Sequence, residues 1–159
     1  MISETFSRVI ARLREKRWTV SLMESCTGGC LADLLTDIPG ASEVFPGGLV
    51  TYGNEAKVRC GVPRETLETY GVYSAETAAA MARAAMDAFG TDVSVGVTGS
   101  LNRADPANAD SVPGEVWCAI RVGETTRTLF WDDIAAETRR ECKMCIALRT
   151  AEELLDRLG

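Results

Sequence analysis

"DVSVGVTG", residues 92–99, is a run of small and apolar side chains with no charge after its first residue. Its continuous apolar character is typical of a strand covered on both faces, so we expect it at the centre of a sheet. An alanine-rich helix is predicted just before it, over 75–89, with Ser74 as its N-cap and Gly90 ending it. The residues after it, 100–114, have no periodicity and contain two prolines, which predicts a loop.

The rest of the chain alternates between helical and strand patterns. Strands are predicted at 18–23 and 47–53, and a hairpin with a Gly-Glu turn is predicted over 115–131. Helices are predicted at 4–16, from Thr27 or the glycine pair to 35, at 54–60 with Asn54 as N-cap, at 63–68, and at 134–158. This order predicts an α/β fold with a mixed sheet covered by helices on both faces. No repeat or linker interrupts the chain, so we expect a single domain over 1–159.

Composition and charge are those of an ordinary globular protein, with 46% hydrophobic and 25% charged residues. The net charge is -6, and the densest basic stretch, 12–17, is interrupted by Glu15, so no nucleic-acid partner is expected. No apolar run approaches the length of a membrane span, and the first residues lack an apolar signal core. We therefore expect no membrane partner and a cytoplasmic location.

The six cysteines are expected to be reduced thiols in that compartment. Cys142 and Cys145 form a CxxC pair, which is compatible with a zinc or redox site. The pair lies inside a predicted helix, however, and the chain has no second CxxC and no histidine. Buried small apolar side chains are the preferred interpretation, and no metal site is expected.

The absence of histidine limits the chemistry that this chain can perform. It excludes Ser-His and Cys-His nucleophile pairs, histidine metal sites and imidazole general bases. Any catalytic group must come from lysine, tyrosine, serine, threonine, cysteine or a carboxylate.

The stretch "ESCTGG" (24–29) lies where a strand is predicted to become a helix. Ligands of open α/β proteins bind at such turns, beyond the carboxyl ends of the strands. Gly28 and Gly29 would let a ligand approach the backbone, and free N–H groups there attract anions or a developing oxyanion. The stretch is neither a Walker loop nor a GxGxxG motif, and a plain tight turn is the alternative.

A second stretch, "VTYGNEAK" (50–57), ends a strand with Tyr52 and begins a helix that carries Lys57. The chain has only three lysines against fourteen arginines. Lysine can lose its proton in a desolvated site and then act as a base, which arginine cannot do. The alternative is a surface lysine with no special role.

Four motifs together resemble the CinA C-terminal domain family: "ESCTGG" (24–29), "VTYGNEAKVRCGV" (50–62), "GVYSAETAAAMA" (71–82) and "GVTGS" (96–100). The characterised members of that family are nicotinamide-nucleotide amidases, also called nicotinamide mononucleotide deamidases. The resemblance covers nearly the whole chain in the right order. It implies a three-layer α/β/α sandwich, a small-molecule nucleotide substrate, the release of ammonia from the nicotinamide carboxamide without a cofactor, and a homo-oligomer.

The resemblance also assigns roles to residues. It implies that Ser25 is the nucleophile and Lys57 its general base, while Tyr52 passes the proton or orients Lys57. Backbone N–H groups around Thr27, Gly28 and Gly29 would bind the oxyanion. The remaining residues expected at the substrate are Asn54, Thr98, Gly99, Asn102 and Arg103.

The 100–114 loop departs from the family pattern, which has a glycine- and proline-rich loop of the type IAGPGGG, although "VPGEVW" (112–117) still resembles its exit. Arg103 in this loop has two interpretations: it binds a substrate phosphate, or it ties down its own loop through Asp105 or Asp110. The departure concerns the substrate more than the chemistry. A non-catalytic nucleotide-binding or protein-interaction module on the same scaffold is the alternative function, which the family's competence-related name suggests.

Overall fold

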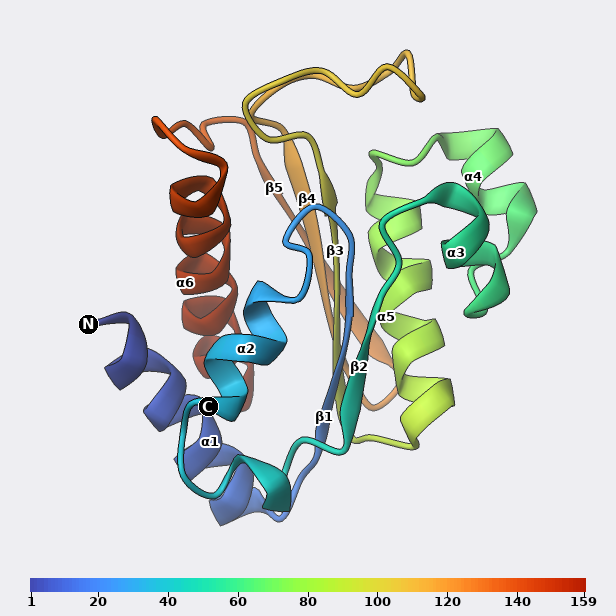
Figure 1. The fold of residues 1–159 in the computed structure, drawn as a ribbon. Helices are drawn as coiled ribbons and strands as arrows, with labels where there is room; N and C mark the ends of the chain where they lie inside the picture. The colour runs from blue at the N-terminus through green and yellow to red at the C-terminus, as the bar shows by residue number, and fades with distance from the viewer.

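The structure, a computed structural model, describes residues 1–159 and contains one five-stranded sheet in the order β2-β1-β3-β4-β5. Helices α1, α2 and α6 lie on one side of the sheet and α3, α4 and α5 on the other (Figure 1), which confirms the predicted three-layer sandwich. The strands are β1 (Val20–Glu24), β2 (Gly47–Val50), β3 (Val93–Gly99), β4 (Val116–Val122) and β5 (Thr125–Trp131). The helices are α1 (Ile2–Lys16), α2 (Cys30–Thr36), α3 (Asn54–Arg59), α4 (Arg64–Tyr70), α5 (Ala75–Phe89) and α6 (Arg139–Leu158), with a 3-10 turn η1 (Ala41–Glu43).

The sheet is mixed, as predicted, and β3 is its central strand. It pairs with β1 in parallel and with β4 antiparallel, and all seven of its residues are buried. Glu24 at the end of β1 is paired with Val50 of β2 and Val97 of β3. The carboxyl ends of these three strands therefore meet at one edge of the sheet.

Helix α5 packs directly on the central strand because Gly96 has no side chain. A Cβ atom at Gly96 would lie 2.7 Å from the Ala82 nitrogen and 2.9 Å from Met81 Cβ. Ser94, two residues earlier on the same face, donates a hydrogen bond to the Ala82 carbonyl. Small residues at the contact thus let the helix backbone approach the strand.

The opposite face of the sheet holds the larger hydrophobic core. Its buried side chains come mainly from α1, α6 and the inner strands, and include Phe6, Ile10, Leu13, Ile146 and Leu154. Neither α1 nor α6 nor any other helix combines the length and the apolar composition that a membrane crossing requires.

Helices α1 and α4 begin within two residues of the prediction, whereas three other helix starts differ from it in ways that affect the site. Helix α2 begins at Cys30 because Gly28 and Gly29 both have positive φ angles, 59° and 99°, which are not helical. Helix α6 begins only at Arg139, where a capping box between Thr138 and Glu141 satisfies the first backbone N–H groups.

The third difference concerns α3, because Asn54 is not its N-cap. Gly53 occupies the cap position, and no side chain caps this helix. The Asn54 side chain instead donates a hydrogen bond to Asn108 in the 100–114 loop, at 3.0 Å. Asn54, the predicted N-cap, is therefore the first residue of α3 and connects this helix to the 100–114 loop.

Candidate active site

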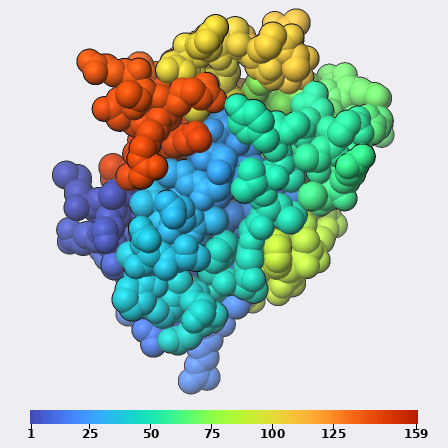
Figure 2. Space-filling view, viewed as in Figure 1, coloured from blue at the N-terminus to red at the C-terminus, as the bar shows by residue number.

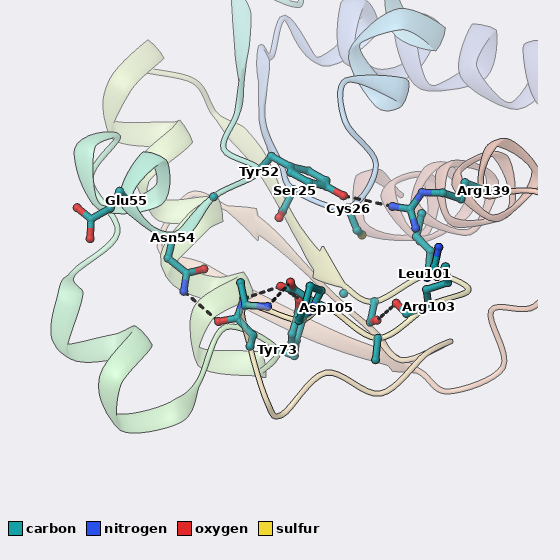
Figure 3. Close-up of a pocket in the computed structure, with 17 residues that line it drawn as sticks. Ser25, Cys26, Tyr52, Asn54, Glu55, Tyr73, Leu101, Arg103, Asp105 and Arg139 are labelled. Atoms are coloured by element: carbon teal, nitrogen blue, oxygen red, sulfur yellow. Dashed lines mark hydrogen bonds between the residues drawn. The ribbon is translucent and has the colours of Figure 1, made fainter.

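A cavity of about 620 Å³ opens at the edge of the sheet where β1, β2 and β3 end. Its walls come from the segments that follow these strands, together with Tyr73 from the segment before α5 and Arg139 from the start of α6 (Figure 3). Figure 2 shows the same segments on the surface, where the 100–114 loop, the start of α6 and the residues after β2 surround the segment after β1. The cavity contains both Ser25 and the backbone around Tyr52.

Ser25 lines this cavity, and Lys57 lies next to it, fully buried and outside the cavity wall. Lys57 Nζ is 2.9 Å from Ser25 Oγ, and the exposed fractions of the two residues are 0% for Lys57 and 6% for Ser25. The same nitrogen lies 2.7 Å from the Thr51 carbonyl oxygen and 3.4 Å from that of Tyr52. No carboxylate pairs with it. A neutral Lys57 amine can therefore donate its two N–H groups to the carbonyls and direct its lone pair at the Ser25 hydroxyl.

Burial favours the neutral form of Lys57. It lowers the pKa of this amine from 10.5 to about 8, while the Asp105 carboxylate acts in the opposite direction. A base with a pKa near the working pH is suited to removing a proton and returning it. Ser25 Oγ and Lys57 Nζ thus lie within hydrogen-bond distance of each other, which is the arrangement that a nucleophile and its general base require.

The loop between β1 and α2 presents free backbone donors. Ser25 N–H donates to Val97 O and Gly28 N–H donates to Ser25 O, both at 3.0 Å. The N–H groups of Cys26, Thr27 and Gly29 have no acceptor in the protein. Of the three residues predicted to bind an oxyanion, Thr27 and Gly29 have a free N–H group and Gly28 does not, but none of the three lines the cavity. Cys26, which was not predicted, has a free N–H group and does line it.

Glu24, which the sequence interpretation missed, holds this loop in place. Its buried carboxylate accepts hydrogen bonds from Leu31 N–H at 2.8 Å and Ala32 N–H at 3.0 Å, in the first turn of α2. It therefore connects the end of β1 to the start of α2 across the Ser25 turn. An acidic residue just before a turn into a helix was the available signal.

The structure does not bring the Tyr52 hydroxyl to Lys57. The Tyr52 side chain is 65% exposed, and its hydroxyl accepts a hydrogen bond from Arg139 at 3.2 Å (Figure 3). Only the Tyr52 carbonyl oxygen approaches Lys57. The hydroxyl is therefore not in position to pass a proton to this amine.

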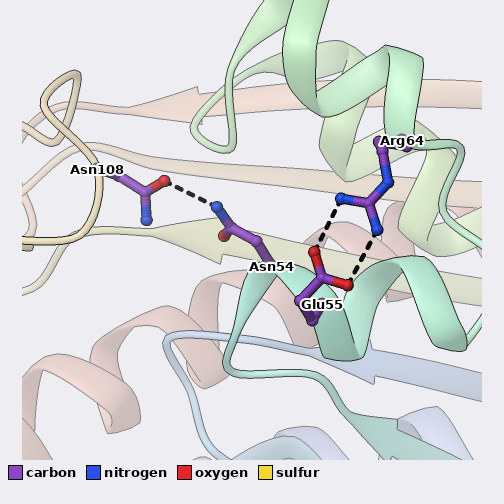
Figure 4. Close-up of polar contacts among 4 residues, drawn as sticks. All are labelled: Asn54, Glu55, Arg64 and Asn108. Atoms are coloured by element: carbon purple, nitrogen blue, oxygen red, sulfur yellow. Dashed lines mark hydrogen bonds and ion pairs between the residues drawn. The ribbon is translucent and has the colours of Figure 1, made fainter.

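A polar network fixes the 100–114 loop over the cavity. Asp105 Oδ2 accepts hydrogen bonds from Tyr73 Oη at 2.8 Å and from Asn108 Nδ2 at 2.6 Å. Asn108 in turn accepts one from Asn54 (Figure 4), which ties the loop to α3. The bonds from Asn108, Ala107 N–H and Tyr73 lower the pKa of Asp105. Burial and the Asp105 carboxylate raise the pKa of Tyr73.

The other predicted residues take different places. Thr98 is buried and donates to the Val72 carbonyl at 2.9 Å, so its hydroxyl is occupied within the fold. Gly99 lines the cavity, and a Cβ there would lie 2.7 Å from Val116. Asn102 accepts a hydrogen bond from Arg139 at 3.3 Å and is not part of the cavity wall.

Arg103 lines the cavity and makes no ion pair. Asp105 is bound to Tyr73 and Asn108, and Arg103 contributes only its carbonyl oxygen, which accepts from Ser100 Oγ at 3.0 Å. The interpretation that the Arg103 side chain ties down its loop through Asp105 or Asp110 is therefore wrong for this structure.

The cysteines are distributed through the core. Burial raises the pKa of the Cys26 thiol to about 12, so the thiol next to Ser25 stays protonated. Cys142 is fully buried in the large core and Cys145 packs at its edge, which fits the apolar interpretation of the CxxC pair. The structure contains no group of three or more cysteine, aspartate or glutamate side chains that could hold a metal ion.

Comparison with known proteins identifies the relatives of this chain. A CinA-like protein from Desulfovibrio desulfuricans is 50% identical over 92 residues, which make up 57% of this chain and 22% of that protein. One from Geotalea daltonii is 44% identical over 131 residues, or 81% of this chain and 32% of that protein. The chain thus spans less than a third of the length of these curated relatives.

Solved structures match along the whole chain. The competence/damage inducible protein CihA from Agrobacterium tumefaciens has a TM-score of 0.87 at 34% identity, covering 99% of this chain and 94% of that one. A competence or damage-inducible protein from Enterobacter asburiae has a TM-score of 0.91 at 25% identity, covering 100% and 99%. The family described as the CinA C-terminal domain matches residues 3–158. The chain therefore belongs to the CinA C-terminal domain family.

Proposed function

We propose that this protein is an amidohydrolase that releases ammonia from the carboxamide of nicotinamide mononucleotide or a related pyridine nucleotide. The observation that supports this most is the 2.9 Å contact between Ser25 Oγ and a buried Lys57 that has no carboxylate partner. Family membership supports it as well, because the family includes amidases. A chain without histidine needs another base, and a desolvated lysine can serve as one.

In the proposed mechanism, neutral Lys57 takes the hydroxyl proton of Ser25 as Oγ attacks the carboxamide carbon. The carbonyl oxygen becomes an oxyanion that the free N–H group of Cys26 in the cavity wall can bind, with the free N–H groups of Thr27 and Gly29 in the same turn. The C–N bond then breaks, and the proton held by Lys57 passes to the leaving ammonia. Water attacks the resulting acyl-serine with Lys57 as base, which releases the carboxylic acid and restores Ser25.

The proposal is tested by measuring ammonia and nicotinate mononucleotide after mixing the purified protein with nicotinamide mononucleotide. We expect the two products in equal amounts, without added metal and in the presence of a chelator. The Ser25→Ala variant removes no apolar group from the core, so we expect it to fold and to release neither product. Activity that is lost on chelation and restored by zinc or magnesium would contradict the metal-free mechanism. Binding of nicotinamide mononucleotide without any turnover would favour the non-catalytic module.

A further inference from the structure

Arg139 is the one residue of the cavity wall that comes from α6, and its guanidinium is held by two neutral groups. Nη2 donates to the Tyr52 hydroxyl at 3.2 Å, and Nη1 donates to Asn102 Oδ1 at 3.3 Å. No aspartate or glutamate forms an ion pair with Arg139. Arg139 is exposed, and these two hydrogen bonds direct its guanidinium while its charge has no acidic partner within the protein (Figure 3).

The negative groups of the cavity are already occupied. Both oxygens of Glu55 are bound by Arg64, at 2.8 and 2.9 Å (Figure 4). Asp105 accepts from Tyr73 and Asn108 on one oxygen and from a backbone N–H on the other.

The positive groups have no such partners. Arg103 and Arg139 line the same cavity, and neither is paired with an acid. With Glu55 neutralised by Arg64, the two arginines outnumber the one remaining acid, Asp105, whose partners are all neutral groups. The cavity therefore has an excess of positive charge in a protein whose net charge is -6. An anionic ligand group would supply the missing partner.

We propose that Arg139 binds the phosphate monoester of the substrate, and that Tyr52 and Asn102 act as positioning residues for its guanidinium. Arginine suits this role because its planar fork offers several donors to phosphate oxygens. Tyr52 then links the two ends of the site, since its carbonyl oxygen contacts Lys57 and its hydroxyl contacts Arg139. The identity of the phosphate-bearing substrate rests on the proposed function, whereas the anion site does not.

The first experiment compares nicotinamide mononucleotide with nicotinamide riboside, which lacks the phosphate. Arg139→Ala should lower the ratio of kcat/KM between mononucleotide and riboside by about tenfold or more, mainly through KM for the mononucleotide. Arg140→Ala is the matched control, because Arg140 is the next residue of α6, is exposed and lies outside the cavity wall. An unchanged ratio in Arg139→Ala would overturn the proposal.

The positioning role of Tyr52 is tested by Tyr52→Phe, which removes the hydroxyl and keeps the ring. This variant should raise KM for the mononucleotide while kcat stays near the wild-type value, because the guanidinium loses one of its two anchors. At Arg139 itself, Arg139→Lys should recover only part of the kcat/KM for the mononucleotide that Arg139→Ala loses, since an ammonium cannot bind phosphate bidentately. A fall in kcat on both substrates would instead assign Tyr52 to the chemical step.

Binding of inorganic phosphate by calorimetry separates this proposal from the proposed function, because it needs no turnover. The wild type and Arg140→Ala should bind phosphate alike, and Arg139→Ala about tenfold or more weakly. Phosphate binding that depends on Arg139, in a protein that hydrolyses neither amide, would leave the anion site standing and contradict the amidase. Amidase activity in a protein whose phosphate binding is unaffected by Arg139→Ala would support the amidase and contradict the anion site at Arg139.

Discussion

A lysine amine beside a serine hydroxyl can act as a base or as a fixed positive charge, and Lys57→Arg distinguishes the two roles. Arginine keeps the charge but does not lose a proton near neutral pH. If Lys57 is the base, Lys57→Arg should lower kcat by roughly 10²–10⁴-fold, nearly as much as Lys57→Ala. Steady-state ammonia release with purified variants measures this. Near-normal turnover in Lys57→Arg would show that only the charge is needed.

The pair of residues should also behave as one unit. Ser25→Ala removes the nucleophile, so adding Lys57→Ala to it should reduce the rate little further. Circular dichroism of the single and double variants provides the control that each remains folded. If the two losses instead multiplied, Lys57 would act on a step that does not involve Ser25.

The pH dependence follows from the lowered pKa of Lys57, which is about 8 because of burial. The protonated amine has no lone pair, so the active form is the deprotonated one that dominates above this pKa. We therefore expect kcat/KM to rise with pH through about 8 and then to level off. A rate profile between pH 6 and 9.5 measures this. A profile that is flat or falls over this range would contradict a lysine base.

Among the connections between elements, the one made by Glu24 joins β1 to α2. Glu24→Ala would leave two N–H groups without their acceptor in a buried region, and a hydrogen bond to a charged group contributes about 1.5–3 kcal/mol to the free energy of unfolding. We expect a clear loss of stability in urea unfolding, together with lower activity because Ser25 is the next residue. Glu124→Ala, an exposed change of equal charge, should leave stability within about 0.5 kcal/mol. Equal stability of the two variants would contradict the role of Glu24.

Helices and strands were predictable from the sequence where a single local pattern, such as an apolar run or an N-cap residue, determines the element. Residues 92–99 are apolar throughout and form the central strand, and Ser74 caps α5 through the Thr77 N–H as expected. The start of α2 was missed because the glycine pair takes positive φ angles instead of opening the helix. The start of α6 was missed although Thr138 and Glu141 have the spacing of a capping box.

The candidate site was predictable only in part, because some of its contacts follow from strand order and others depend on how distant segments pack. Ser25 and Lys57 lie on segments that follow adjacent parallel strands, so strand order alone brings them to one edge. Arg139 reaches Tyr52 across 87 positions of the chain, through the path of α6. Contacts of this kind, like that of Tyr73 with Asp105, depend on how loops and helices cross and leave no local pattern.

At the scale of the whole molecule, the sheet order explains why the cavity lies where it does. Strand β1 lies between β2 and β3 and runs parallel to both, so the segments after all three strands leave the sheet at the same edge. The antiparallel strands β4 and β5 extend the sheet on the other side of β3. Helix α6, packed on the face opposite α5, brings its first turn to the same edge and closes the cavity with Arg139 (Figure 1).

The sandwich depends on the close contact of α5 with the central strand, and Gly96→Ala tests whether the chain unfolds as one unit. A Cβ at Gly96 would overlap the α5 backbone, so the helix must move away from β3 and from its neighbours β1 and β4. Overpacking of this kind typically costs 1–3 kcal/mol, which for a protein of this size predicts a fall in Tm of roughly 3–10 °C. Gly53→Ala is the control, since its φ is -92° and no atom lies within 4 Å of the added Cβ.

The unfolding transition of Gly96→Ala should be followed by far-UV circular dichroism for the helices and by near-UV signals for the three tryptophans. Trp18 lies before β1, Trp117 is in β4 and Trp131 ends β5, so the near-UV signals report on regions far apart in the chain. If residues 1–159 are a single domain, both signals should shift together to the lower Tm, because a clash at the centre of the sheet destabilises every layer at once. Two separate transitions would contradict the single domain, and an unchanged Tm would contradict the close packing of α5 on Gly96.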